Sequence, residues 1–441
     1  MTVSIPRFAS GDRHAAVKSY HHGAWQGLVT GGSKADSNNG THDLIFVENL
    51  DASAALEAVQ ALASRHPFIA GHIEERDGAP WLVPGSASAV SIETFDLRDT
   101  PASVRVRAGR ERIGALVWRP FDLQAGPLSR FYIGALDETL SVFGFVVHHF
   151  VCDGASVKIL AREFLALYEA ARRRQAPEPL PEGVGYSDYL RGMNEWMASP
   201  SGAQARQAAL ARVRDLPLLR FDRLETFEPE HAELQTPWSE LARVARQMKT
   251  TPFTVLLAAH SLCLLSHTVD GRVATRIVTS GRDTAALLHT VGNLADRMYV
   301  IADLSQAATF ADVVKATTKA LIQAQAHAFV RDEFVQWDLW EAGWRCDVPV
   351  LNFIGDRGLS RSERYPDLTV PHPPQAATRP RDCYYMVIQT EEDRISTYAR
   401  FGAGRISGLS MRLSAALAAC CRTPDARIET LRAIIDCTDI T

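Results

Sequence analysis

The residues best suited to chemistry lie at 148–154, where the chain reads HHFVCDG. An imidazole has an ordinary pKa of about 6.5, so His148 or His149 could act as a general base near neutral pH. Successive side chains on a strand point to opposite faces, so one of two adjacent histidines can face a cavity while the other packs. The spacing therefore predicts one reactive histidine and one supporting histidine.

Asp153 and Gly154 complete this segment. Asp153 follows His149 by four residues, beyond the expected end of the strand, where its carboxylate could hold the turn in place. Gly154 has no Cβ, and we expect it to let the backbone bend closely at this point. Both residues are predicted to support the site.

The elements on either side of the segment must position it. Residues 142–147, VFGFVV, form an apolar run that is typical of a strand. After Gly154, four apolar residues recur at helical spacing: Val157, Leu160, Phe164 and Tyr168. We therefore predict a strand, a short turn that carries the histidines, and an amphipathic helix that clamps the turn by packing.

Other patterns indicate the domain organisation. Leu56, Val59 and Leu62 predict the buried stripe of another helix, which ends before Pro67. The stretch PEPLP at 177–181 cannot be helical and predicts an extended connector. With 441 residues, 46% of them hydrophobic, the chain can fill two cores of about 200 residues each. We predict two domains, residues 1–185 and 186–441.

The HHxxxDG pattern resembles the acyl-transfer motif of the condensation domains of nonribosomal peptide synthetases, which belong to the chloramphenicol-acetyltransferase superfamily. Seven further segments resemble motifs of that family in the same order: RHP at 65–67, PFDLQAGPLSR at 120–130, YSDY at 186–189, TPFTVLLAA at 251–259, GR at 281–282, VGNL at 291–294 and NFIG at 352–355. The PFDLQAGPLSR segment is the most specific of them. An ordered set of this kind extends the resemblance over most of the chain.

The resemblance implies an α+β fold, an αβ sandwich, with two chloramphenicol-acetyltransferase-like lobes arranged as a V and a tunnel at their interface. By the same resemblance His149 is catalytic, while His148, Asp153 and Gly154 support it. The implied donor is an acyl thioester on the phosphopantetheine of an acyl or peptidyl carrier protein. The acceptor is a hydroxyl or an amine, small or carrier-bound, so the product is an ester or an amide.

We expect a free-standing condensation enzyme of nonribosomal peptide or hybrid polyketide biosynthesis, because no further synthetase domain fits in this length. No bound cofactor is expected. Two departures from the family concern the site. The Arg that often pairs with the heptad Asp falls on Ile301, which leaves Arg282 and Arg297 as alternative partners for Asp153. The usual Asn-Thr is Asp296-Arg297, which favours an ester or a diffusible acceptor.

Three other functions stay open, and two of them share the heptad. A coenzyme A dependent O- or N-acyltransferase is the main alternative, although the plant-type DFGWG motif is absent. An epimerisation domain would carry a Glu-containing motif in the second lobe that is not apparent here. A recruitment module without chemistry is disfavoured because both His149 and Asp153 are present.

Composition excludes several classes of protein. A net charge of −4 gives no basic footprint for nucleic-acid binding. Seven cysteines without CxxC spacing argue against a disulfide framework or a zinc site, and no metal is expected at the heptad, because adjacent strand residues diverge. Cys152 and His260 are interpreted as packed residues. With no apolar stretch after Met1 and none long enough to cross a bilayer, we predict a cytoplasmic protein. We also expect it to be a monomer.

Overall fold

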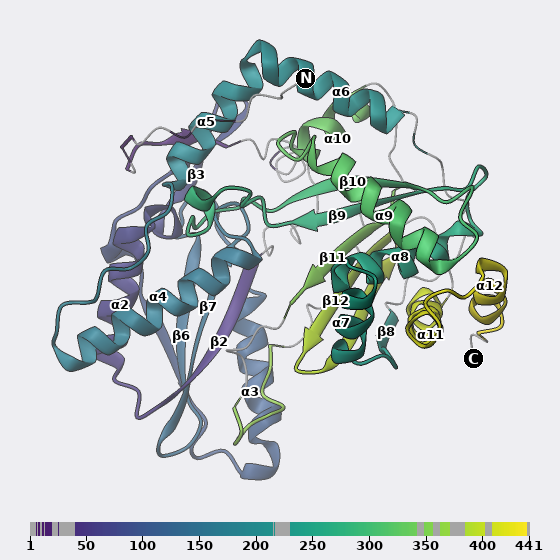
Figure 1. Cartoon of the computed structure of the whole chain (residues 1–441). Coiled ribbons are helices and arrows are strands. Elements are labelled where there is room, and N and C mark those ends of the chain that lie inside the picture. Colours follow the sequence, from purple (N-terminus) through teal and green to yellow (C-terminus); the bar gives the residue numbers. More distant parts are fainter. Residues whose placement is uncertain are drawn as a thin grey trace.

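The computed structural model describes residues 6, 8, 11–12, 14–19, 25, 40–214, 216, 230–341, 348–355, 362–370, 384–401 and 408–438. Within them the chain forms three β-sheets and a set of helices packed on two of these sheets (Figure 1). Two large hydrophobic cores, one for each of the larger sheets, and a third small core hold the structure together.

The sheet that carries the histidine segment has four strands, in the spatial order β2-β7-β6-β5. Their bounds are β2 (Gly40–Glu48), β5 (Ile92–Asp96), β6 (Ser129–Ala135) and β7 (Leu140–His148). β7 lies inside the sheet and is antiparallel to both neighbours. Every residue of β7 except Ser141 is buried, as expected for a strand covered on both faces. The predicted strand at 142–147 is confirmed.

Three helices and two short 3-10 turns belong to this first lobe: α2 (Ala52–Arg65), α3 (Ala102–Val117), α4 (Gly154–Arg173), η2 (Pro67–Ala70) and η3 (Ala87–Ala89). The smallest sheet, in the order β1-β4-β3, lies beside them and consists of β1 (Val17–Lys18), β3 (His72–Arg76) and β4 (Ala79–Val83). α2 and α4 pack against each other (Figure 1).

The structure confirms one of the two predicted helical stripes in full and the other in part. All four residues of the α4 stripe are buried, which confirms that prediction. In α2, Val59 and Leu62 are buried, but Leu56 is 37% exposed. The prediction for Leu56 was wrong because alanines, among them Ala55 and Ala58, complete the buried face of α2.

The second lobe is built on a six-stranded sheet in the order β10-β9-β11-β12-β13-β8. Its strands are β8 (Glu230–Glu233), β9 (Arg272–Thr279), β10 (Asp296–Asp303), β11 (Val350–Ile354), β12 (Tyr384–Glu391) and β13 (Arg394–Phe401). β11 is parallel to β9 and β12, and the other pairs are antiparallel. Along β12 buried and half-buried residues alternate, which shows that one face of this strand meets the core.

The remaining helices, with the 3-10 turn η4 (Ala285–Leu287), are α5 (Tyr186–Ala198), α6 (Pro200–Arg214), α7 (Trp238–Gln247), α8 (Pro252–Leu265), α9 (Phe310–Gln325), α10 (Asp332–Glu341), α11 (Leu409–Arg422) and α12 (Ile428–Asp436). Residues 254–264 of α8 are all buried, so this helix forms the centre of the second core. Among the described residues no single helix is long and apolar enough to cross a membrane, and α7 with α8 meets that criterion only as a bent pair.

Residues 174–185 connect α4 to α5 without helix or strand, as the proline-rich sequence predicted. We keep the division at 185/186 as a proposal for the lobe boundary. The first turns of α5 pack back on the first core, to which Tyr186 and Leu190 belong. Leu287, Val291 and Leu294, from the loop between β9 and β10, join the same core. That loop therefore crosses from the second lobe to the first.

Candidate active site

His148 and His149 lie at the end of β7 with different surroundings. His148 is the last residue of the strand and is 1% exposed, with its ring 5.2 Å from that of Phe150 and 5.4 Å from that of Phe121. Its Nδ1 accepts a hydrogen bond of 3.3 Å from the backbone N–H of Phe150. His149 is the first residue of the turn and is half-buried. Of the two imidazoles, that of His149 is the accessible one.

Asp153 ends the turn and caps α4. Its backbone is extended, and its Oδ1 accepts a 2.8 Å hydrogen bond from the N–H of Ser156. A carboxylate in this position satisfies one of the unpaired N–H groups of the helix and interacts favourably with the helix dipole. The turn that carries His149 is therefore fixed at one end by β7 and at the other by the start of α4.

Arg282 binds Asp153 through both guanidinium nitrogens, Nη1 to Oδ2 at 2.8 Å and Nη2 to Oδ1 at 3.0 Å. The exposed fractions of the two side chains are 4% and 1%. Arg282 also donates to the carbonyls of Ser280 and Thr290, each at 2.8 Å. Such paired geometry is the strong form of a guanidinium–carboxylate contact, and it joins the two lobes.

The loop between β9 and β10 adds further bonds to this ion pair. The backbone N–H groups of Leu294 and Ala295 each donate to Asp153 Oδ2 at 2.9 Å. Ser156 Oγ donates to the carbonyl of Gly292 at 2.8 Å and accepts from its N–H at 3.0 Å. We call Asp153, Ser156, Arg282, Leu294 and Ala295 the interlobe knot.

Gly281 allows the loop to approach itself closely. Its φ is +63°, and a Cβ at this position would lie 1.9 Å from the carbonyl oxygen of Leu294. Glycine populates this backbone region without steric cost. The conformation of Gly281 therefore allows Arg282 and Leu294 to contact Asp153 together.

The environment of Asp153 stabilises its charged form. Burial alone would raise the pKa of Asp153, but the charge of Arg282 and the hydrogen bonds from Arg282 and Ser156 outweigh burial, so the pKa lies below its ordinary value. Asp153 is thus a carboxylate with its charge matched and its oxygens bonded. Its hydrogen bonds come from the other residues of the knot, and they suit holding the turn in position.

Arg297, the other candidate partner, does not reach Asp153. It lies on β10, and its Nη1 is 3.7 Å from Oδ2 of Asp332. The prediction that Arg297 could pair with Asp153 is corrected in favour of Arg282. Ile301 lies farther along β10, opposite Ala274 of β9. The cation comes from the loop because the loop folds back over the start of α4.

Asp296 belongs to a second charged group beside the knot. Its Oδ1 accepts from the N–H groups of Arg297, at 2.8 Å, and Asp332, at 3.0 Å. Its Oδ2 lies 3.4 Å from Nε of Arg331 but accepts no hydrogen bond among the described residues. Burial raises the pKa of Asp296 to about 6, against the charge of Arg331 and with the help of Asp332.

Gly154 does not play the part expected of it. It is the first residue of α4, its φ is not positive, and a Cβ built on it would meet no atom within 4 Å. The backbone therefore does not require glycine at this position, and the predicted close bend was wrong. Cys152 is fully buried, and burial raises the pKa of its thiol, which fits a packed residue better than a nucleophile.

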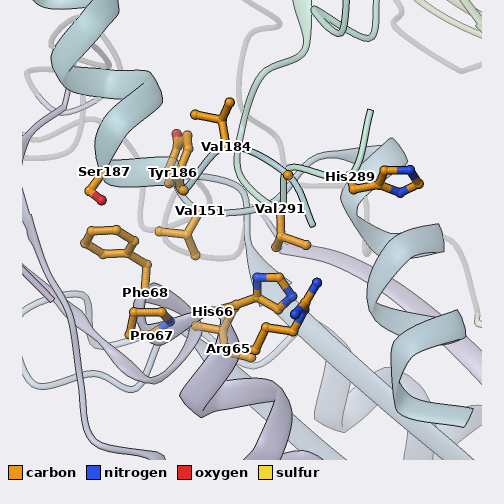
Figure 2. Close-up of a pocket in the computed structure, with 13 residues that line it drawn as sticks. Arg65, His66, Pro67, Phe68, Val151, Val184, Tyr186, Ser187, His289 and Val291 are labelled. Atoms are coloured by element: carbon orange, nitrogen blue, oxygen red, sulfur yellow. The ribbon is translucent and has the colours of Figure 1, made fainter. Parts of the chain in front are cut away.

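A small cavity of about 40 Å³ lies at the junction of the lobes, beside Val151 of the heptad. Figure 2 shows Arg65 and His66 on one side of it, with Tyr186 and Val291 across from them. His66 Nε2 is 2.7 Å from Oε2 of Glu163, which is buried in α4. The cavity has room for a few water molecules and not for an acyl chain, so the predicted tunnel stays a prediction.

Sequence reasoning missed several residues of the knot. Ser156 could have been found from the sequence. It is a polar residue next to Val157 on the predicted buried side of the helix, and it follows the capping residue Asp153 by three positions, where a cap side chain bonds to the backbone. The N–H groups of Leu294 and Ala295 offered none, since backbone contacts leave no mark on residue type. Tyr186 was noticed as part of YSDY, and its hydroxyl donates to the carbonyl of Phe150 at 3.0 Å.

Comparison with known sequences gives a family match over most of the chain. The sequence matches the Condensation domain family over residues 34–333. It is 28% identical over 334 residues, 73% of this chain, to one of the linear gramicidin synthase proteins of Brevibacillus parabrevis. It is 26% identical over 296 residues, 63% of this chain, to chondramide synthase cmdD of Chondromyces crocatus. The aligned parts span only 6% and 7% of the lengths of these two synthases.

Solved structures share the fold. The X-domain from teicoplanin biosynthesis, solved in complex with OxyB, is 19% identical, covers 97% of each chain and superposes with a TM-score of 0.73. The condensation domain that mediates chain release from the enacyloxin polyketide synthase is 20% identical, covers 100% of this chain and 85% of its own, and has a TM-score of 0.70. These likenesses confirm the predicted α+β fold.

Proposed function

Because the chain belongs to the condensation-domain family, we propose that it transfers an acyl group from a carrier-protein phosphopantetheine thioester to the hydroxyl or amine of an acceptor. The family is one of transferases that form amide or ester bonds. That the enzyme is free-standing, binds no cofactor of its own and works with separate carrier proteins is part of the proposal.

The observation that carries the proposal is the position of His149. Its half-buried imidazole lies on a turn that is held by β7 on one side and by the interlobe knot on the other. A general base must be held in place and must also be reachable by the proton it accepts. His149 meets both requirements, whereas His148 is enclosed between aromatic rings.

In the proposed reaction, His149 takes the proton of the acceptor hydroxyl or amine as that group attacks the thioester carbon. The new C–O or C–N bond forms, and the carbonyl electrons move to the oxygen. When they return, the C–S bond breaks and the thiolate leaves with the proton held by His149. Asp153 and Arg282 take no proton in this scheme and keep the turn in place.

The main alternative is a coenzyme A dependent acyltransferase, and the fold alone does not distinguish it. Nor does the fold distinguish an enzyme from a recruitment module, because the teicoplanin X-domain has the same architecture and was solved bound to OxyB. The intact histidine and the matched charge of Asp153 favour an enzyme over a recruitment module. The family match favours a carrier-bound donor over coenzyme A.

The test uses acyl groups loaded on a phosphopantetheinylated carrier protein, with product followed by intact mass. His149→Ala should lower turnover by about 10² to 10⁴ without changing the melting temperature. His148→Ala should reduce stability more than turnover per folded molecule, and His14→Ala, at an exposed position, is the matched control. Wild-type turnover in folded His149→Ala protein contradicts the assignment.

A second measurement separates the donor classes and the products. Carrier-bound donors should react far better than the same acyl group on coenzyme A or N-acetylcysteamine, and equal rates would favour the coenzyme A dependent alternative. Matched amino and hydroxy acceptors, offered with one donor, decide the bond. We propose ester formation, since Asp296-Arg297 replaces the usual pair of the family, and amide as the sole product would overturn this.

A further inference from the structure

A groove of about 900 Å³ lies on the second lobe, between the end of α7, one face of α9 and the turn before α12. We call it the lysine groove and define it by Met248, Lys249, Lys315, Lys319, Ile322 and Asp425, which line it. It has no residue in common with the interlobe knot or with the cavity beside Val151.

The groove concentrates lysine. The chain has six lysines, at 18, 34, 158, 249, 315 and 319, so half of them line this one surface. All three are exposed, and no carboxylate of the described residues lies within ion-pair distance of them. Asp312, three residues before Lys315, caps α9 through the N–H groups of Ala308 and Thr309. Asp425 also lines the groove, so its lining carries three positive charges against one negative charge, and the excess is available to a partner.

Lys249 is placed at a backbone position that usually belongs to glycine. It follows the end of α7 with φ +54°, while Thr250 N–H bonds to the carbonyl of Ala245 and Lys249 N–H to that of Arg246. This arrangement ends many helices and favours a residue without Cβ at the left-handed position. The fold thus carries a lysine side chain at the groove in a conformation that is unfavourable for it.

α9 presents charge and apolar surface in a regular order. Lys315, Lys319 and Ile322 follow each other by four and three residues, so they lie on one face of the helix. Ile322 is 64% exposed, and Met248 and Val314 add apolar lining. A surface of this kind matches a ligand that has carboxylates beside an apolar stripe.

We propose that the lysine groove docks an acidic amphipathic helix of a partner protein. A helix about 10 Å in diameter occupies roughly 120 Å³ per residue, so the groove accommodates about two turns. Helices that bind this way insert an apolar face into the groove and fix their orientation by charge. A nucleic acid or a lipid headgroup would satisfy the lysines but leave the exposed Ile322 and the apolar lining without contacts.

The experiment uses full-length protein and a fluorescent helical peptide of roughly 18 residues, with glutamates on one stripe and leucines on the next. Binding should weaken as salt is added. The double variant Lys315→Glu with Lys319→Glu should raise Kd at least tenfold. Lys249→Gly should also raise Kd, and because glycine suits that backbone, its melting temperature should equal or exceed that of the wild type. A photoreactive peptide should cross-link to residues 311–323.

The controls keep the proposal falsifiable. Arg107→Glu with Arg110→Glu, at exposed positions on α3, makes the same change in net charge and should leave Kd unchanged. A peptide with lysines in place of the glutamates should not bind. The proposal is overturned if the acidic peptide does not saturate at millimolar concentration or binds both double variants equally. It is also overturned if oligothymidylate or phosphatidylglycerol vesicles bind in a Lys249-dependent way and the peptide does not.

Discussion

Asp153 contacts the loop between β9 and β10, and Asp296 directly follows that loop. Both are buried carboxyl groups, and their pKa values are shifted in opposite directions. The pKa of Asp153 lies below its ordinary value, whereas that of Asp296 is raised to about 6. Each has an arginine within ion-pair distance, Arg282 for Asp153 and Arg331 for Asp296. Burial and the presence of a cation therefore do not explain the difference.

The difference lies in how the oxygens are bonded and in the nearby charge of Asp332, which raises the pKa of Asp296. Both oxygens of Asp153 accept well-oriented hydrogen bonds, from the paired nitrogens of Arg282 and from three backbone N–H groups. Among the described residues, one oxygen of Asp296 accepts no hydrogen bond, and its contact with Arg331 lacks hydrogen-bond geometry. Hydrogen bonds to the charged form are what offset the loss of hydration in a buried site. Hydrogen-bond geometry and the neighbouring charges together set the pKa of each group.

We expect the largest loss of stability when the ion pair between Asp153 and Arg282 is broken. Arg282→Gln leaves Asp153 buried without its cation and should reduce the free energy of unfolding by about 3 to 5 kcal/mol. Chemical denaturation of the variant measures this. In the double variant with Asp153→Asn, the combined loss should be smaller than the sum of the single losses. Additive losses would mean that the two side chains do not act as a pair.

His260 tests the same reasoning on a buried group with no hydrogen bonds. Neither ring nitrogen has a partner among the described residues, and burial lowers its pKa to about 4. The unfolded chain binds a proton near pH 6.5 and the folded chain does not, so stability should fall as the pH is lowered from 6.5 to 4. The shift corresponds to about 3 kcal/mol.

In His260→Leu this part of the pH dependence should disappear. Unfolding free energies of variant and wild type, measured between about pH 4 and 7.5, give the difference directly. A difference that does not change with pH would show that His260 is not buried as a neutral group.

For Asp296 we expect the opposite dependence of stability on pH. Its folded pKa of about 6 lies above the unfolded value of 3.8, so the folded protein holds the proton more tightly and stability falls as the pH rises through this window. Asp296→Asn should remove that fall. Relative to the wild type, the variant should gain about 2 kcal/mol as the pH rises from about 4 to 7.5, less than the full shift because at pH 4 the unfolded Asp296 is already partly ionised. A relative gain on lowering the pH would contradict the comparison.

Substitution of Gly154 should give the smallest effect. It tests whether this glycine is needed for stability or leaves room for a substrate. It begins α4 with open surroundings, so Gly154→Ala should raise the free energy of unfolding by up to about 1 kcal/mol. Thermal unfolding and turnover are measured on the same preparation. A loss of turnover without a loss of stability would indicate that glycine leaves room for a substrate. A clear loss of stability would contradict the described backbone.

The parts of the site that follow from local pattern were predictable. The apolar run before the histidines and the helical spacing after Gly154 predicted strand β7 and helix α4, and both are present. The partner of Asp153 was not predictable, because Arg282 and Arg297 are both near in sequence and the choice depends on how the loop folds back at Gly281. The pKa of Asp296 depends on one unbonded oxygen, which no sequence pattern reveals. Leu56 was misjudged because the sequence does not show how alanines let α2 pack closely.

The knot also determines where the molecule can hinge. Seven hydrogen bonds join four residues of the second lobe to Asp153 and Ser156 at the first turn of α4, and separating them would expose a buried ion pair. A rotation of one lobe against the other therefore costs least when its axis passes through this point. Under such a rotation the surfaces far from the axis would move most, and contacts such as those of Arg364 with Glu48 and Asp137 would have to break. His149, next to the pivot, would stay nearly stationary.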